Sequence, residues 1–286
     1  MVDLLVIGGL GVDVRVQVPA LPPPVADSLL VPPIDMRIGN TGAGVALAAH
    51  ALGLRVALVD VLGADPAGDV VRAALARTSI RTTLADAPAG TRRSVNLVDP
   101  AGRRMSLHDP RPWSGPVPFG EAELAALVAE AAHVHLSIMD WARDSLAVLR
   151  AATSVSTDLH DWDGENDYHR PFARIADLVF VSDTRLGERA AAEAARLAPR
   201  TVLVTGGAAG ATLHTPDAPP AHVPAATPPG QVVDTNGAGD AFAAGVIAAR
   251  LRGAGVLDAA RYAARVAAAA CTHDGMEYPD GLLPRE

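Results

Sequence analysis

Short runs of apolar residues alternate with longer stretches of mixed polarity along most of this chain. The apolar runs end in turn-forming residues and predict strands that are buried on both faces, while the stretches between them carry the period of amphipathic helices. The predicted strands span residues 4–7, 56–61, 134–138, 155–159, 178–181 and 202–204. The predicted helices span residues 67–77, 144–152 and 186–197, and a further one begins in the turn at 39–44 and ends at 52. This order predicts an α/β fold with a mainly parallel central sheet covered by helices.

A different pattern occurs near the N-terminus and again after residue 90. Valines at positions 12, 14, 16 and 18 alternate with Asp13, Arg15 and Gln17, which is the period of a half-exposed strand. Residues 34–38 follow as a candidate partner, and residues 91–108 form two strand-like runs around a proline- and glycine-containing turn. The proline-rich stretches 21–33 and 216–229 are typical of loops, because neither separates two self-sufficient patterns. We therefore expect a single domain over residues 1–286.

All 24 basic residues are arginine, and the sequence contains no lysine. A Walker A loop, a protein-kinase site and a pyridoxal Schiff base each need a lysine, so these sites are excluded in their usual form. A net charge of −8 without a long basic run argues against nucleic acid and against an anionic membrane surface as partners. The pairs Arg92-Arg93 and Arg103-Arg104 flank the predicted hairpin, where we expect solvated side chains.

The expected location of the protein is the cytoplasm. The N-terminus passes from Met1 directly into an apolar strand, without the basic start and the cleavage region of a signal peptide. No apolar run reaches membrane-spanning length without a charge or a proline. The single cysteine, Cys271, lies in an alanine-rich helical stretch, where a buried and inert thiol is expected.

The glycine-rich turn at residues 234–242, with the sequence DTNGAGDAF, carries the strongest chemical signal. Gly237 and Gly239 allow a ligand to approach the main chain, and an apolar stretch that reads as a helix follows them. The first amides of a helix have no intrahelical acceptor and favour a phosphate. Asp240 would repel such an anion unless it has another task, such as accepting a proton from an attacking hydroxyl. A hydroxyl that attacks a phosphate indicates kinase chemistry.

The segment DTNGAGD is similar to the signature DTxGAGD of the ribokinase/PfkB-type carbohydrate and nucleoside kinases. The resemblance implies that Asp240 is the general base and that the backbone amides of Gly237, Ala238 and Gly239 form the anion hole. It also implies a ribokinase-like three-layer αβα fold with a small β-sheet lid, whose strands would lie within residues 12–38 and 91–108. ATP with Mg²⁺ would be the phosphoryl donor, and a sugar or sugar derivative the acceptor.

Substrate-binding positions follow from the same resemblance. Asp13 lies just after the first predicted strand, where ligands of open α/β sheets bind, and a carboxylate there can accept hydrogen bonds from two sugar hydroxyls. The turn that contains Gly39, Asn40 and Gly42 resembles the family's GGxxxN pattern, and these residues are predicted to line the substrate site. Asn40 replaces the second glycine of that pattern, and Gly44 stands where an asparagine usually contacts substrate.

Nucleotide-binding positions are predicted at the ends of two later strands. Thr205, Gly207 and Gly210 match the family's TxGxxG turn. Ser182 begins the segment SDTR in the place of the NxxE motif that organises Mg²⁺ in the family, and Arg185 could contact phosphate there.

Further polar residues remain as candidates. Asp158 matches the aspartate of the family's DxN pattern, and a polar loop at residues 160–163 follows it; we expect a loop that faces the ligand rather than a dedicated metal site. Asp140 and Trp141 are candidates for the sugar pocket or for a surface loop. Asp234 and Asn236 match the positions beside which related kinases bind an alkali ion such as K⁺.

Two alternatives to a sugar kinase stay open on the sequence. A nucleoside kinase would use Asp13 equally well, because ribose offers the same vicinal hydroxyls. A sugar- or nucleotide-binding regulatory protein could have kept the fold and lost turnover. The exposed edges of lid strands also predict a homodimer formed through the lid.

Overall fold

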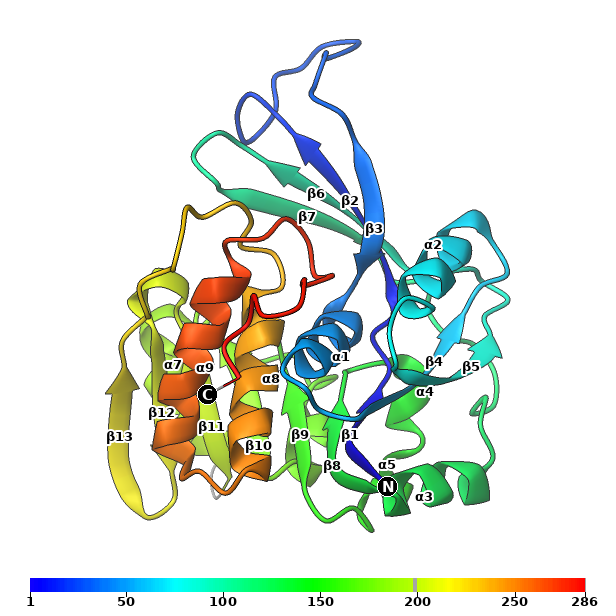
Figure 1. Cartoon of the computed structure of the whole chain (residues 1–286), viewed down its shortest axis with the longest axis vertical. Coiled ribbons are helices and arrows are strands. Elements are labelled where there is room, and N and C mark those ends of the chain that lie inside the picture. Colours follow the sequence, from blue (N-terminus) through cyan, green and yellow to red (C-terminus); the bar gives the residue numbers. More distant parts are fainter. Residues whose placement is uncertain (198–199, 286) are drawn as a thin grey trace.

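The computed structural model describes residues 1–197 and 200–285, and this part of the chain forms a large central sheet, flanking helices and a smaller sheet (Figure 1). The strands of the central sheet are β1 (Val2–Ile7), β4 (Val56–Leu62), β5 (Arg81–Asp86), β8 (Ala131–Leu136), β9 (Val155–Asp158), β10 (Leu178–Ser182), β11 (Thr201–Thr205), β12 (Ala211–Thr215) and β13 (Ala218–Val223). They are arranged in the order β13-β12-β11-β10-β9-β8-β1-β4-β5. The seven strands from β11 to β5 are parallel, while β12 and β13 form an antiparallel edge. The predicted α/β class is confirmed.

Helices cover both faces of the central sheet. One face packs against α1 (Thr41–Ala51), α2 (Pro66–Leu75), α8 (Ala238–Leu251) and α9 (Val256–Ala270). The other face packs against α3 (Glu121–Ala129), α4 (Asp140–Arg143), α5 (Leu146–Leu149), α6 (Arg170–Ile175) and α7 (Ala190–Leu197). Successive residues of β1 point to opposite faces, so that Leu4 and Val6 join the first apolar core while Leu5 and Ile7 join the second. Two cores explain why residues 4–7 of β1 form a continuous apolar run. No helix in the described ranges is long and apolar enough to cross a membrane.

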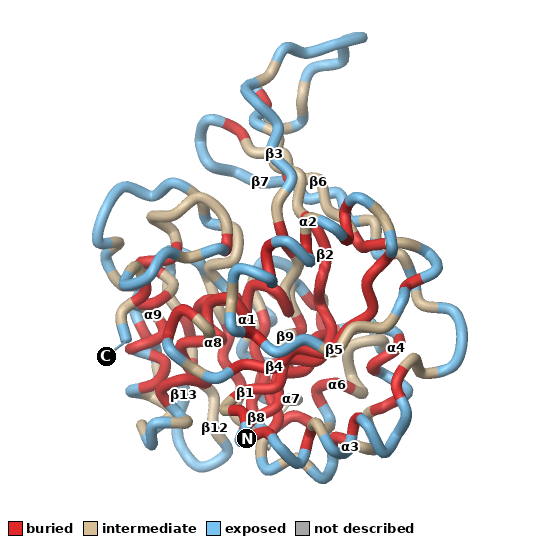
Figure 2. The backbone as a smooth tube through the Cα atoms, turned by 45° about the vertical axis from the view of Figure 1, so that its right-hand side comes forward, coloured by how far each residue is buried: buried red, intermediate tan, exposed pale blue. Residues whose placement is uncertain are grey.

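The smaller sheet extends from the body as a lid, and its outer end is largely exposed (Figure 2). Its strands are β2 (Gly11–Gln17), β3 (Asp35–Gly39), β6 (Arg93–Val98) and β7 (Arg104–Asp109), in the order β3-β2-β6-β7. The register places polar residues together on the face toward the body, namely Asp13, Arg15, Arg37, Ser94, Asn96, Ser106 and His108. The opposite face carries Val12, Val14, Val16, Met36, Ile38, Val95, Leu97, Met105 and Leu107. The alternation that predicted half-exposed strands therefore separates a polar inner face from an apolar outer face, although Val12 and Ile38 at the root of the lid are buried in the first apolar core.

Three predictions about local structure are wrong. The helix predicted at residues 144–152 is shorter than expected, because only α5 at Leu146–Leu149 lies within this range and the separate helix α4 ends before it at Arg143. The stretch 216–229 is not entirely a loop, because residues 218–223 form the edge strand β13. An edge strand tolerates proline, since the side of the strand that faces solvent needs no backbone N–H for the sheet. Arg92 is not solvated: its side chain is 7% exposed. The elements β5, β12, α3 and α6 were not predicted from the sequence.

Arg92 connects the root of the lid to the central sheet through a buried ion pair. Its Nη1 donates to Oδ2 of Asp60 at 2.9 Å and to the carbonyl oxygen of Leu10 at 3.2 Å. Asp60 lies on β4, is completely buried, and also accepts hydrogen bonds from the amides of Leu10 and Val61 and from Nε1 of Trp141. The carboxylate of Asp60 thus holds three segments together: the turn after β1 through Leu10, the start of β6 through Arg92, and helix α4 through Trp141.

Two buried histidines on β8 make stability depend on pH. The Oγ of Ser156 lies 2.8 Å from Nε2 of His133 and 2.9 Å from Nδ1 of His135. Burial lowers the pKa of His133 to about 4 and the pKa of His135 to about 3. Both rings are therefore neutral in the folded protein at neutral and mildly acidic pH.

We expect His135→Gln to weaken acid destabilisation. The unfolded chain binds a proton at each histidine below about pH 6.5, and the folded state does not until far lower pH, so stability falls as pH decreases through this window. Each histidine contributes a loss of about 1.4 kcal/mol per pH unit. The free energy of unfolding, measured in urea at pH 7 and pH 5, should therefore fall less in His135→Gln by about 2 kcal/mol. The exposed His222→Gln serves as the control, and an equal pH dependence in all three proteins would contradict the expectation.

Candidate active site

The segment DTNGAGD at residues 234–240, called the signature turn below, leads directly into α8 next to the lid. Gly237 is the N-cap of α8 and has a φ of 77°, a left-handed conformation that favours glycine. A Cβ atom at Gly237 would also lie 2.8 Å from Cγ of Met276. At Gly239, in the first turn of the helix, a Cβ atom would meet nothing within 4 Å. The amide of Ala238 donates to the carbonyl oxygen of Thr235 at 3.3 Å, and no described backbone hydrogen bond uses the amides of Gly237 and Gly239 at the start of α8, where an anion hole would form.

Asp240 is buried in the first turn of α8, with a relative exposure of 9%. Burial raises the pKa of its carboxyl well above the usual range of aspartate. The charges of Asp158 and Asp13 raise this pKa further, while the charge of Arg104 lowers it. A carboxylate in this environment is a stronger base than a solvated one, and it lies beside the amides that can hold a phosphate.

Asp13 of β2 faces the signature turn. Its Oδ2 accepts a hydrogen bond from Nδ2 of Asn236 at 2.8 Å, and Nη1 of Arg104 donates to Oδ1 of the same asparagine. Burial raises the pKa of Asp13, although Asn236 and Arg104 oppose the shift. Gly39 lies across from this carboxylate, and a Cβ atom at Gly39 would lie 2.6 Å from Oδ1 of Asp13. The structure therefore brings the predicted substrate carboxylate to the signature turn.

The turn before α1 has two roles. Asn40 has a φ of 76°, and its Oδ1 accepts a hydrogen bond from the amide of Thr41 at 3.1 Å, so it caps α1. Gly42 packs tightly against the first turn of the chain, because a Cβ atom there would lie 2.9 Å from Cα of Gly9. This close packing alone requires glycine at position 42, whether or not the residue also contacts substrate.

Gly44 provides the space that Asp240 occupies. A Cβ atom at Gly44 would lie 2.6 Å from Cγ and 2.7 Å from Cβ of Asp240. An asparagine at this position, as in the family's GGxxxN pattern, would displace Asp240 from its present place. The departure of this chain from that pattern therefore has a steric reason.

Gly44→Ala should lower kcat by roughly 10- to 100-fold, because a displacement of about 1 Å at a catalytic group can cost 10²-fold. Alanine is a better helix former than glycine by about 1 kcal/mol, so the loss of activity should occur without a matching loss of helix. Steady-state kinetics and circular dichroism measure the two effects. Gly120→Ala is the control, because a Cβ atom there meets nothing within 4 Å. Equal kcat values for the two variants would show that Asp240 is not displaced.

The predicted nucleotide residues lie at the ends of two paired strands. Ser182 of β10 is aligned with Thr205 of β11, and Oγ of Ser182 lies 2.7 Å from Oγ1 of Thr184. Gly207 has a φ of 55° and an open surface, whereas Gly210 packs against the chain after β13, where a Cβ atom would lie 2.8 Å from the amide nitrogen of Ala225. No described contact joins these residues to Asp240.

The polar loop after β9 does not converge on the signature turn. Asp158 alone is close enough for its charge to raise the pKa of Asp240. Arg185 pairs instead with Asp163 at 3.4 Å. Among the residues that the structure describes, no group of three or more His, Cys, Asp or Glu side chains is arranged to hold a metal ion.

Neither residue of the pair at positions 140 and 141 forms a surface loop. Both lie in α4. Trp141 is buried and donates to Asp60, so it is a core residue. Asp140 is exposed, and its Oδ1 accepts a hydrogen bond from the hydroxyl of Tyr168 at 2.8 Å.

The inner face of the lid contributes side chains that sequence reasoning missed. Oγ of Ser106 donates to Oδ1 of Asn96 at 2.6 Å, and Oγ of Ser94 lies 3.0 Å from Nδ1 of His108. The register places these side chains on the same face of the lid as Asp13, and on that face Arg104 donates to Asn236 of the signature turn. The polar positions alternate within the hairpin at residues 91–108, and that alternation was the signal that could have identified them.

The oxygen atoms around Asp234 already have a cationic partner. Oδ1 of Asp234 accepts from the amide of Asn236 at 3.0 Å, and Oδ2 lies 3.6 Å from Nη1 of Arg15. Nη2 of Arg15 donates to the carbonyl oxygen of Val233 at 3.3 Å. An alkali ion beside Asp234 would need these carboxylate and carbonyl oxygens, so the residues present do not fit one.

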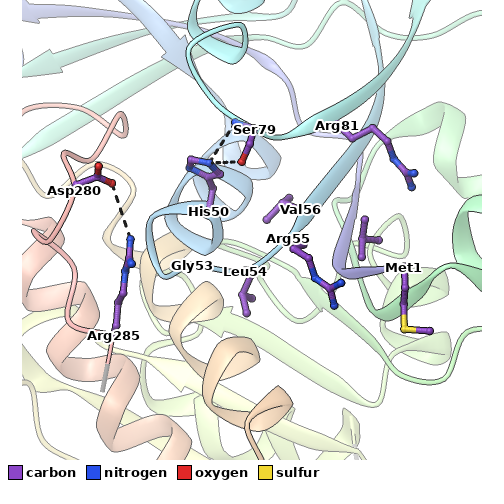
Figure 3. Close-up of a pocket in the computed structure, with 11 residues that line it drawn as sticks. Met1, His50, Gly53, Leu54, Arg55, Val56, Ser79, Arg81, Asp280 and Arg285 are labelled. Carbon is purple, nitrogen blue, oxygen red and sulfur yellow. Dashed lines mark hydrogen bonds and ion pairs between the residues drawn. The ribbon is translucent and has the colours of Figure 1, made fainter.

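A pocket of about 540 Å³ lies at the opposite end of the central sheet (Figure 3). It is lined by the starts of β1, β4 and β5 and by the end of α1. Arg55 and Arg81 at its rim pair with Asp3 and Glu130. Ligands of open α/β sheets bind at the carboxyl ends of the strands, so we place the active site at the signature turn and not in this pocket.

Comparisons with known proteins agree with this geometry. Residues 1–280 match the family model described as pfkB family carbohydrate kinase. The chain is 42% identical over 275 residues to an acarbose 7(IV)-phosphotransferase from an Actinoplanes species, an alignment that covers 94% of this chain and 92% of the relative.

Solved structures give the same result. A microbiome-derived acarbose kinase, Mak1, superposes with a TM-score of 0.87 at 42% identity and covers 98% of this chain and 95% of its own. Arabidopsis thaliana ribokinase complexed with ribose and ATP superposes with a TM-score of 0.81 at 21% identity, covering 99% and 96% of the two chains, and supports the fold. The chain is an ATP-dependent sugar kinase and belongs to the pfkB family of carbohydrate kinases.

Proposed function

We propose that this kinase transfers the γ-phosphoryl group of ATP to a hydroxyl of acarbose, with Asp240 as the general base. The observation that carries the catalytic assignment is the position of Asp240: a buried carboxylate of raised pKa in the first turn of α8. Asp240 takes the proton of the attacking hydroxyl. The hydroxyl oxygen then forms a bond to the γ-phosphorus, the bond from that phosphorus to the bridging oxygen breaks, and ADP leaves.

The amides at the start of α8 stabilise the charge on the transferred group. Gly237, Ala238 and Gly239 supply these amides, and a preorganised backbone needs no reorganisation during the reaction. The charge of the group is also favoured by the positive end of the α8 dipole. Walker A loops and protein kinases hold phosphate with a lysine, which this chain lacks. Here the backbone amides and arginine side chains take over that role.

The substrate site lies between the signature turn and the inner face of the lid. Asp13 accepts hydrogen bonds from sugar hydroxyls after its hydrogen bond from the side-chain Nδ2 of Asn236 breaks. Asn40 lines the entrance beside the first turn, and Gly39 and Gly42 keep the backbone close to the substrate. The polar side chains of the hairpin cover the sugar from the lid.

The nucleotide site lies at the ends of β10 and β11. Thr205, Gly207 and Gly210 form its phosphate- and ribose-facing turn, and Ser182 offers a hydroxyl. Asp158 is the carboxylate that we assign to the Mg²⁺ of the nucleotide, because Mg²⁺ is usually held by one or two carboxylates together with substrate phosphates. Bound Mg²⁺ neutralises charge on the phosphates. The proposed reaction includes no alkali ion, since Arg15 already faces Asp234.

Acarbose is the proposed acceptor because two relatives that are each 42% identical to this chain carry acarbose in their names. Release of ADP, measured with ATP and Mg²⁺ against acarbose, ribose and adenosine, tests the assignment. We expect acarbose to give the highest kcat/KM. A preference for adenosine would identify a nucleoside kinase instead. Tight binding of sugar or nucleotide without ADP release across the panel would identify a binding protein.

We also propose a homodimer formed through the lids, acting in the cytoplasm where ATP is available, with residues 1–286 as one functional domain. The apolar outer face of the lid supports the dimer, because Met36, Met105 and Leu107 are each between 45% and 49% exposed. Burial of such a patch against a second copy would remove it from water. Analytical ultracentrifugation of Leu107→Glu should show a shift toward monomer relative to the wild type.

A further inference from the structure

The guanidinium of Arg15 connects the lid to the signature turn. Arg15 lies on the inner face of β2, two residues after Asp13. Its Nη1 donates to Oδ1 of Asp274 at 2.6 Å and lies 3.6 Å from Oδ2 of Asp234, and its Nη2 donates to the carbonyl oxygen of Val233. The side chain of Asp234 is only 10% exposed, so its charge is poorly screened by water. One arginine therefore neutralises the first carboxylate of the signature and anchors the residue before it.

The same turn is closed from the other side by backbone contacts. The carbonyl oxygen of Cys271, at the end of α9, accepts hydrogen bonds from the amides of Val233 and Asp234 at 2.8 and 3.2 Å. Oδ1 of Asp234 accepts from the amide of Asn236. The described oxygens of this cluster thus already have donors or a cation, and the cavity that Arg15, Asp234 and Asp274 line there has a volume of about 30 Å³.

We propose that Arg15 is a positioning residue that supplies, from the protein itself, the fixed positive charge beside Asp234 for which related kinases use an alkali ion. The proposal rests on the proposed function. A guanidinium presents donors in a fixed geometry and remains charged at every relevant pH, so it can hold Asp234 and the Val233 carbonyl without an exchangeable ion. A second cation at the same oxygens would be repelled by Arg15. Phosphoryl transfer by this chain consequently needs Mg²⁺ but not K⁺.

Ion dependence of the wild type and of Arg15→Ala tests the proposal. We expect kcat of the wild type to be unchanged when KCl is replaced by tetramethylammonium chloride at equal ionic strength. In tetramethylammonium, Arg15→Ala should lose roughly 10- to 100-fold in kcat, because the signature turn is displaced. Either K⁺ or the conservative variant Arg15→Lys should restore part of this activity. Arg37→Ala is the matched control, because Arg37 also pairs with Asp274 but makes no described contact with Asp234.

A second readout does not depend on knowing the acceptor. Thermal unfolding should show no difference between KCl and tetramethylammonium chloride for the wild type and for Arg37→Ala. Arg15→Ala should gain stability specifically in KCl, because an ion that binds only the folded state raises Tm. This readout stays informative even if none of the tested sugars is phosphorylated.

Three results would overturn the proposal. The first is a wild-type kcat or Tm that falls on removal of K⁺. The second is an Arg15→Ala variant that keeps the wild-type kcat in tetramethylammonium. The third is a loss of kcat in Arg15→Ala that neither K⁺ nor Arg15→Lys restores, which would show a structural contact without a role for the charge.

Discussion

Asp240→Asn is expected to lower kcat by about 10²- to 10⁴-fold, because the variant keeps the shape of the side chain and loses the general base. The affinity for ATP should change little, since the amides of Gly237, Ala238 and Gly239 remain in place. Single-turnover measurements of ADP formation at saturating acceptor report the chemical step directly. The amide of the variant also removes a negative charge near Asp158 and Asp13, so its KM for ATP should not increase.

The pH dependence gives an independent signature of the same residue. Asp240 acts only when it is deprotonated, and its pKa lies above the usual range of aspartate. The kcat of the wild type should therefore fall on acidification at a higher pH than a solvated aspartate would give, and Asp240→Asn should lack this dependence. Asp258→Asn changes an exposed carboxylate and should match the wild type. An unimpaired Asp240→Asn variant would exclude Asp240 as the general base.

Asp60→Asn is expected to lower the free energy of unfolding by about 3–5 kcal/mol, because it leaves the buried guanidinium of Arg92 without a counter-charge. The cost includes hydrogen bonds, since Asp60 accepts from Leu10, Val61 and Trp141 as well. Urea denaturation measures the loss. The variant should also reduce catalytic efficiency, because the pair fixes the turn before β2, which carries Asp13.

Asp167→Asn is the matched control for the buried pair. Asp167 accepts from Nε of Arg170 at 2.6 Å, but its side chain is 89% exposed. An exposed pair of this kind is worth about 0–1 kcal/mol. Similar losses of unfolding free energy in Asp60→Asn and Asp167→Asn would show that burial does not strengthen the dependence of stability on the charge of Asp60.

The sequence predicted the fold where one local pattern determined the structure. Continuous apolar runs such as residues 56–59 require two buried faces, and the two apolar cores on either side of β4 provide them. Alternating polarity in residues 12–18 predicted a half-exposed strand, and β2 has this form. The signature turn was also readable, because Gly237 needs its left-handed φ and a helix must follow it.

Long-range partners could not be read from the sequence. Arg92 looks like a solvated strand residue until β4 brings the buried Asp60 to it, 32 positions earlier in the chain. The contact between Arg15 and Asp234 joins residues from opposite ends of the sequence, and no spacing rule predicts it. Gly44 appeared to be a missing substrate residue, although its role depends on the side chain of Asp240 in a different helix.

In the proposed reaction, Asp240 enables transfer of a phosphoryl group from ATP to a sugar hydroxyl. The most direct test is mass spectrometry of acarbose after incubation with the kinase, ATP and Mg²⁺. The proposed function predicts that acarbose gains one phosphoryl group in step with ADP formation, and that Asp240→Asn slows both equally. Formation of ADP without any change in the mass of acarbose, or phosphorylation at the wild-type rate by Asp240→Asn, would contradict it.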